Sequence, residues 1–238
     1  KILAARRVAR AIMLGSAPTV RQQNVRGLEA SRVRLGVTQP GEQVALFNDA
    51  CNTLKNKLAY LYTNPSGDRF WYDTRPTLRK TVEDRATQVA ASDVEFEIER
   101  RLKKLRKEAP FAGIHVCPAS SLDVPDEQAV RLVVLRPAES YAQSAQDCAA
   151  MRAVSEMFEK RGTAPRMYRN MLVFLAADQA LMANLEQEVR RFIAWTSIKE
   201  DSQDLNLDAA QNRETEVSLK RSDETVDLLL KEAWCWLL

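Results

Sequence analysis

Glycine, histidine and long apolar runs are scarce in this chain of 238 residues. With 7 glycines, the composition disfavours a turn-rich all-β fold and favours helices. One histidine and four scattered cysteines without a CxxC pair argue against a zinc site, and we expect no bound metal. No stretch approaches the roughly 20 apolar residues of a membrane span. We therefore expect a cytoplasmic protein with buried or free thiols and no membrane partner.

Phosphate-binding motifs are also absent. The sequence contains neither GxxxxGK[ST] nor GxGxxG, the glycine-rich patterns that cradle nucleotide phosphates. We therefore assign no catalytic residue and no cofactor to this chain, and we predict that it does not hydrolyse ATP.

The charge balance changes sign along the chain, and both ends are unusual. Residues 1–74 hold 11 basic and 5 acidic side chains, whereas residues 199–238 hold 5 and 10. A basic segment attracts the phosphates of nucleic acid, but it can also face an acidic protein surface or water.

The chain opens on lysine and closes on the apolar run AWCWLL, whereas natural ends are usually polar. We expect a fragment of a longer protein.

Residues 1–74 are predicted to form a winged-helix-like domain. Its first element is an amphipathic helix over 2–14, with one apolar face made of Ile2, Leu3, Val8, Ile12 and Met13. Then follow a short helix over 25–31, a short strand over 33–37, a helix over 42–57, and strands over 58–62 and 69–73 that flank a turn. Helix, short strand, helix and hairpin is the order of a winged helix.

The basic side chains of this domain are the candidate nucleic-acid-binding residues: Arg6, Arg7, Arg10, Arg32, Arg34, Lys55, Lys57 and Arg69. The helix over 42–57 carries only Lys55 and Lys57 as cations, which is few for a helix that follows phosphates. We therefore favour a winged helix that contacts protein. Any DNA binding should be weak and sequence-nonspecific, because few side chains of this helix could read base edges.

A linking helix is predicted over 75–110, with helix from about 77 to 107 and a break near 90–93. Its segment 100–107, RRLKKLRK, is strongly basic. We interpret this segment as a solvated face paired with nearby glutamates, in preference to a phosphate contact.

Residues 111–238 are predicted to form a small, mainly parallel α/β domain with helices on both faces of its sheet, so that the whole chain is mixed α/β. We expect strands over 113–117, 130–135 and 171–176, and helices over 144–161, 179–199 and 207–233. The run Met171–Ala176 is wholly apolar, which is typical of a strand buried on both faces. We expect it to lie between the other two strands or beside one of them.

Four carboxylates are candidates for an acidic cluster: Asp73, Asp123, Asp126 and Asp178. Asp178 follows the apolar strand as the acid of a Walker B motif would, but without a phosphate loop we favour a helix cap. Asp123 and Asp126 follow a strand end, where α/β sheets bind ligands, although turn caps are the simpler interpretation. Convergence of the four would favour a degenerate nuclease-like or nucleotide-binding domain.

Two weaker patterns remain. His115 and Cys117 are two residues apart, which would place them on one strand face, but we favour a structural histidine over a nucleophilic pair. Arg166 and Arg169 flank Tyr168, and they either touch a phosphate or form a surface pair.

Several segments together resemble a known family: RVARAIMLGSAP (7–18), VRLGVTQPGEQVALFNDA (33–50), LAYLYTNPSGDRFWYDTRPTLRKTVEDRA (58–86), FAGIHVCPASSLDVPDE (111–127), PRMYRNMLVFLAAD (165–178) and LNLDAAQNRETEVSLKRSDETVDLLLKEAWCWLL (205–238). The chain is similar to the later part of large prokaryotic P-loop ATPases of AAA type, the domain-of-unknown-function family numbered four-nine-nine. FWYDTRP and YRNMLVFLAAD are the most specific marks.

The resemblance implies an upstream ATPase core that binds ATP and Mg²⁺, and an association with DNA methyltransferases and helicases in phage-defence or restriction-like gene clusters. No ATP-site residue carries over, because the family's phosphate-binding motifs have no counterpart here. We therefore expect a non-catalytic regulatory and interaction fragment of such an ATPase, with the ATPase core as a partner. A DNA-binding module and a degenerate enzyme are the alternatives.

Overall fold

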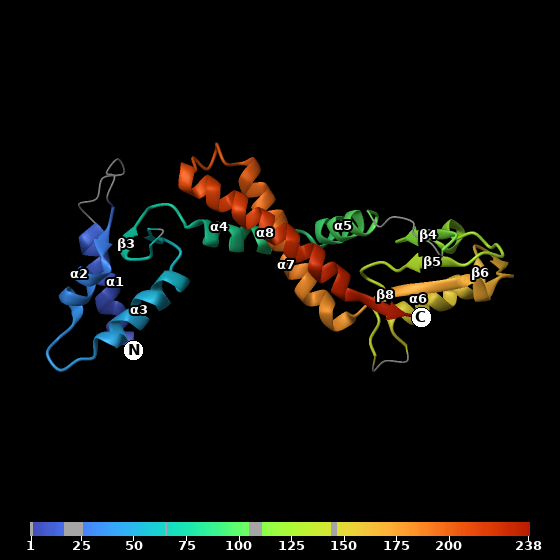
Figure 1. Cartoon of the computed structure of the whole chain (residues 1–238), viewed down its shortest axis with the longest axis horizontal. Coiled ribbons are helices and arrows are strands. Elements are labelled where there is room, and N and C mark those ends of the chain that lie inside the picture. The colour runs from blue at the N-terminus through green and yellow to red at the C-terminus, as the bar shows by residue number, and fades with distance from the viewer. Residues whose placement is uncertain (1, 17–25, 65, 105–110, 144–146) are drawn as a thin grey trace. The chain divides into compact units, whose positions relative to one another are not determined.

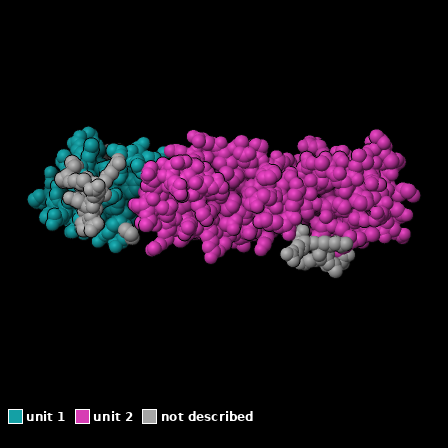
Figure 2. All heavy atoms as spheres, turned by 90° about the horizontal axis from the view of Figure 1, so that it is seen from above, with its two compact units in different colours: residues 1–81 teal, residues 82–238 magenta. Residues whose placement is uncertain are grey.

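The computed structural model describes residues 2–16, 26–64, 66–104, 111–143 and 147–238 (Figure 1). The chain divides into two compact units, residues 1–81 (unit 1) and residues 82–238 (unit 2), coloured separately in Figure 2. Both units combine helices with strands, so the predicted mixed α/β class is confirmed. Across the described ranges, no helix has the length and apolar character needed to cross a membrane.

Unit 1 consists, in chain order, of α1 (Ile2–Ser16), β1 (Leu28–Glu29), α2 (Ala30–Val37), α3 (Val44–Lys57), β2 (Leu61–Thr63), β3 (Arg69–Tyr72) and the start of α4 (Leu78–Gln88). Strand β3 pairs antiparallel with both β1 and β2, which gives the order β1-β3-β2. Gly27 leads into β1 with a φ of 77°, and a Cβ at this position would lie 2.5 Å from the Phe70 carbonyl oxygen. Only glycine permits this close approach.

One apolar core joins the three helices of unit 1 to its small sheet. The buried side chains at its centre include Val8, Ile12, Val33, Phe47 and Phe70. The predicted hairpin and the predicted helix over 42–57 are confirmed as β2–β3 and α3.

The predicted strand over 33–37 is wrong, because these residues form the second half of α2. Val33 and Val37 are one helical turn apart, and both bury in the core shared with α1 and α3. The alternation of apolar residues over 33–37 predicted a strand, but burial of Val33 and Val37 against α1 and α3 favours a helix instead. The strand lies earlier, at Leu28–Glu29, where the sequence pattern predicted helix.

Unit 2 consists of the end of α4, α5 (Ala91–Leu102), β4 (Gly113–Val116), η1 (Ser121–Asp123), β5 (Arg131–Val134), α6 (Ala149–Glu159), β6 (Lys160–Arg161), β7 (Ala164–Pro165), η2 (Arg169–Met171), β8 (Leu172–Ala177), α7 (Gln179–Glu200), α8 (Ala209–Ala233) and β9 (Trp234–Leu237). Its main sheet has the order β4-β5-β8-β9, with β4, β5 and β8 parallel and β9 antiparallel to β8. The prediction that Met171–Ala176 lies beside another strand of this sheet is confirmed. Residues 144–146 of the helix predicted over 144–161 lie outside the described residues.

The two faces of this sheet belong to two different apolar clusters. On one face, Val134 and Ala177 pack against α5, α7 and α8. On the other face, Val133 and Phe174 pack against α6. The apolar segment Trp234–Leu237 forms β9, and its Trp236 packs against the apolar cluster that contains Val133 and Phe174.

The long helix predicted over 77–107 is two helices, α4 and α5, and the predicted break falls between them. Residues 105–107 lie outside the described residues. The solvated face predicted over 100–107 is wrong for Arg101, which is 5% exposed. Because Arg101 lies seven residues after Val94, it continues the apolar stripe of α5. Its guanidinium donates to carboxylates of Glu97, Asp223 and Asp227.

Candidate nucleic-acid interface

Helix α3 has an apolar inner face and a polar outer face. The inner face carries Phe47, Ala50 and Cys51, all buried in the core of unit 1. Since successive residues turn by about 100° around a helix, the face opposite this core can be read from the sequence. It is made of exposed residues: Ala45, Asn48, Asp49, Asn52 and Asn56. This face therefore offers hydrogen-bond donors and acceptors to a partner, and no large apolar side chain.

Three of the predicted cations lie around this outer face. Lys55 and Lys57 are exposed in the last turn of α3. The ammonium of Lys55 is close to the β2–β3 turn, since a Cβ on Gly67 would lie 3.6 Å from its Nζ. Arg34 of α2 donates from Nη1 to Oδ1 of Asn48 at 3.1 Å. Helices α2 and α3 thus bring positive charge to one region, beside the hairpin turn.

Arg6, Arg10 and Arg32 are exposed but belong to other surfaces of unit 1. Helices α1 and α3 pack against each other through their buried faces, so their outer faces point away from one another. Arg6 and Arg10 lie opposite the buried Val8 on α1. Arg32 lies on the flank of α2 opposite to Arg34. The candidate cations of unit 1 therefore lie on more than one surface.

The apolar face of α1 also differs from the prediction. The buried positions are Ala4, Val8 and Ile12, spaced four residues apart. Leu3 and Met13 are 75% and 68% exposed, and the side chain of Ile2 lies outside the described residues.

The remaining two predicted cations hold unit 1 together. Arg7 pairs with Glu42 at 2.5 Å, and its guanidinium lies over the Phe47 ring. Arg69 pairs with Glu29 at 2.7 Å and also donates to the Gly27 carbonyl. These side chains connect elements distant in the chain, which the sequence pattern did not reveal.

The candidate carboxylates of unit 2 do not converge. Asp126 accepts hydrogen bonds from the backbone amides of Met167 and Tyr168, before β8, at 2.7 and 2.9 Å. Asp178 follows the other end of β8, and a strand of this length separates the two by about 20 Å. Asp123 accepts from the backbone amide of Ser120, the N-cap of η1, and so completes the capping box of this turn.

The fourth candidate, Asp73, belongs to unit 1, where its carboxylate accepts from the backbone amide of Thr74 at 2.6 Å. Within the described part of the chain, no group of three or more His, Cys, Asp or Glu residues is placed to hold a metal ion.

Asp178 is the cap of α7, as favoured over the Walker B interpretation. Its Oδ1 accepts from the Ala180 amide at 2.8 Å, and its Oδ2 accepts from the Trp236 indole at 2.8 Å. The bond from Trp236 holds the pKa of this carboxyl below its usual value. Because both oxygens have partners, the carboxylate helps to fix β9 and α7 to the end of β8.

His115 and Cys117 do not form a pair. Cys117 has a φ of 51°, which interrupts the strand alternation, and its side chain packs in the cluster that includes Ile114 and Val116. His115 lies beside Arg131 instead, 3.3 Å from its guanidinium. Burial raises the pKa of the Cys117 thiol to about 12, so it is protonated at neutral pH.

Arg166 is neither a phosphate ligand nor part of a surface pair, because it is 3% exposed and bound to backbone carbonyls. Its Nε donates to Met157 at 2.8 Å, Nη1 donates to Pro125 at 2.9 Å, and Nη2 donates to Val124 at 3.1 Å and Ser121 at 3.3 Å. The guanidinium thereby fixes the loop that follows β4.

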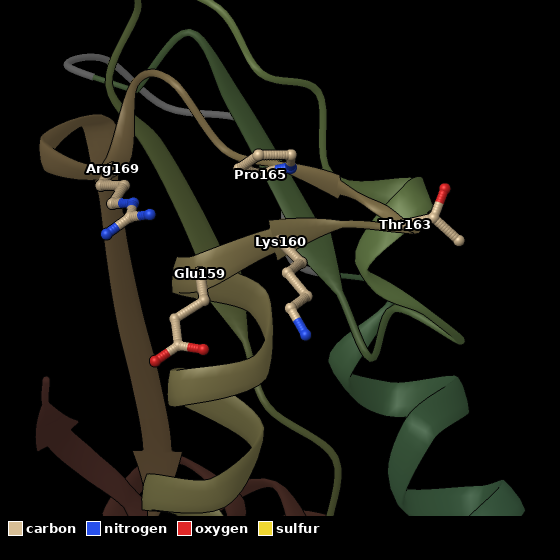
Figure 3. A pocket seen from close by; sticks show the side chains of 5 residues that line it. All are labelled: Glu159, Lys160, Thr163, Pro165 and Arg169. Carbon is tan, nitrogen blue, oxygen red and sulfur yellow. The ribbon is translucent and has the colours of Figure 1, made fainter.

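Beside the β6–β7 hairpin lies an open depression of about 400 Å³, shown in Figure 3. Its lining consists of Glu159, Lys160, Thr163, Pro165 and Arg169. In the view of Figure 3, the side chain of Glu159 lies between those of Lys160 and Arg169, so a negative charge separates the two positive charges. We assign no ligand to this depression.

No family model, curated protein or solved structure matches this chain. The likeness to an ATPase family thus rests on the sequence segments quoted above.

Proposed function

We propose that this chain is a non-catalytic binding module and that its unit 1 is a winged helix that binds duplex DNA. The order α1-β1-α2-α3-β2-β3 supports this proposal, because it places two successive helices before a β-hairpin. The observation that carries it is the outer face of α3, where short hydrogen-bonding side chains lie between the cations Arg34, Lys55 and Lys57.

In the proposed complex, α3 lies in the major groove and the three cations contact phosphates on either side. The β2–β3 turn, which lies beside Lys55, follows the adjacent backbone. Three phosphate contacts give a slope of log K against log salt of about −3. Affinity for an arbitrary duplex is then modest, with a Kd of about 10⁻⁴ to 10⁻⁶ M at physiological salt.

A protein partner is the competing occupant of α3. Protein interfaces are built around an apolar centre that is depleted in charge. The outer face of α3 over 45–56 offers three asparagines and an aspartate instead. This composition favours DNA as the partner of α3. The small number of cations on α3 had, by itself, favoured a protein partner.

By its resemblance to the ATPase family, the module would serve an ATPase core that binds ATP and Mg²⁺, together with DNA methyltransferase or helicase partners in the cytoplasm. Unit 2 then acts as a scaffold without chemistry of its own. Its carboxylates are engaged in caps and turns, which supports this role.

The test is a titration of labelled duplex with the full chain between about 50 and 200 mM salt. The variant Lys55→Glu/Lys57→Glu should bind at least about tenfold more weakly, with a salt slope smaller by about 2. Lys199→Glu/Lys231→Glu is the matched control, because it makes the same charge change at exposed positions of unit 2. Absence of wild-type binding at the lowest salt, or an equal loss in both variants, would refute the proposal.

A further inference from the structure

Three asparagines form a continuous ridge on α3. Asn48, Asn52 and Asn56 are spaced four residues apart, and all three are exposed opposite the buried core of unit 1. We name them the asparagine ridge. In the part of the chain that the structure describes, the side chains of Asn52 and Asn56 have no hydrogen-bond partner, and Arg34 holds Oδ1 of Asn48. The amides of Asn52 and Asn56 are thus available to a ligand, whereas Asn48 keeps only its Nδ2 donors.

The fold itself does not require asparagine at these positions. Asparagine is a poorer helix former than alanine, because its side chain competes with the backbone for hydrogen bonds. At Asn52 and Asn56, which are exposed and have no hydrogen-bond partner among the described residues, alanine, lysine or glutamate would support α3 better. Local choices that oppose the fold are typical of functional sites.

The chemistry of the ridge matches one base. A carboxamide offers one acceptor and two donors, and it pairs with N6 and N7 of adenine in the major groove. Ala45 lies on the same face, and an alanine methyl can contact the methyl group of thymine. We propose that the asparagine ridge reads adenine, so that unit 1 binds adenine-bearing duplexes in preference to G·C duplexes. This inference rests on the proposed DNA-binding function, and it replaces the expectation of sequence-blind binding.

The spacing of the ridge sets the spacing of the bases. Residues four apart rise about 6 Å along a helix, and base pairs rise about 3.4 Å along B-DNA. Neighbouring asparagines therefore reach bases about two base pairs apart. Phosphate contacts from Arg34, Lys55 and Lys57 provide affinity in this arrangement, and the ridge provides selectivity.

The experiment compares three duplexes of equal length with the full chain at one salt concentration. The first carries adenines two base pairs apart, the second has 7-deazaadenine at those positions, and the third has only G·C pairs. Replacing N7 by a carbon removes the acceptor in the major groove and leaves the minor groove unchanged. The wild type should bind the first duplex at least about fivefold more tightly than the other two.

Asn52→Ala/Asn56→Ala should bind all three duplexes equally, with an unchanged salt slope and a thermal midpoint at or above that of the wild type. Asn184→Ala, an exposed asparagine on α7 of unit 2, is the matched control and should keep the adenine preference. Equal wild-type binding to the adenine and 7-deazaadenine duplexes overturns this inference and leaves the proposed function standing. Absence of binding to every duplex overturns both.

Discussion

The two units of this chain differ in how they hold basic side chains, because the buried arginines of the described residues lie in unit 2. Unit 1 has 14 basic and 5 acidic residues, and it leaves Arg6, Arg10 and the two lysines of α3 exposed. Unit 2 has 21 basic and 27 acidic residues, and it buries Arg101 and Arg166 among fixed acceptors. A buried guanidinium is tolerated only when its donors are satisfied. The count of charges therefore says little about their role, whereas burial and partners separate binding cations from structural ones.

Among the substitutions that test this comparison, the one at Arg166 is expected to have the largest effect. Arg166→Leu removes hydrogen bonds to four carbonyls and should lower the free energy of unfolding of unit 2 by about 4 kcal/mol. Urea unfolding with thiol labelling checks this, since Cys117 reports unit 2 and Cys51 reports unit 1, and both are buried in the folded chain. Cys117 should become reactive at lower urea while Cys51 is unchanged. A stability equal to that of the wild type would mean that the guanidinium is not structural.

A slightly smaller loss is expected for Arg101→Met, about 3 kcal/mol, because it removes a buried guanidinium that donates to Glu97, Asp223 and Asp227 and leaves the buried Glu97 carboxylate with only the more exposed Arg100. Arg100→Met is the control: its side chain is 46% exposed, and its pair with Glu97 is worth about 1 kcal/mol or less.

The Arg101 effect should depend on pH. Burial alone would raise the pKa of Glu97, but hydrogen bonds from Arg100 and Arg101 outweigh burial and lower it. The stabilisation is therefore present above the ordinary pKa of 4.5 and is lost as pH falls below that value. The difference in stability between wild type and Arg101→Met should shrink over this acid range. A difference that stays constant or grows would show that Glu97 is not the group involved.

The smallest effect is expected at Arg6 and Arg10, which lie on the outer face of α1, away from that of α3. Arg6→Glu/Arg10→Glu should weaken duplex binding by only about two- to threefold, through long-range charge, with nearly the same salt slope. A loss as large as that of Lys55→Glu/Lys57→Glu would place α1 in the interface.

The sequence predicted elements whose signals are local. The apolar run of β8, the turn residues of the hairpin and the acid before α7 each specify their structure within a few residues. Features that depend on distant partners were missed or misread: α2 at Val33–Val37, strand β9 and the burial of Arg101 and Arg166. Arg166, for example, is bound by carbonyls about 40 residues earlier in the chain. The asparagine ridge could have been found, because its spacing of four residues is visible in the sequence.

Lysine footprinting of the full chain with and without duplex DNA tests the central claim most directly, because it reports both units in one sample. Lys55 and Lys57 should be protected from acetylation by DNA, whereas the exposed lysines of unit 2, Lys160, Lys199, Lys220 and Lys231, should react equally in both samples. Protection should disappear as salt is raised, together with binding. Protection of Lys103, Lys104 or the other lysines of unit 2, with Lys55 and Lys57 unaffected, would contradict the assignment of DNA binding to unit 1.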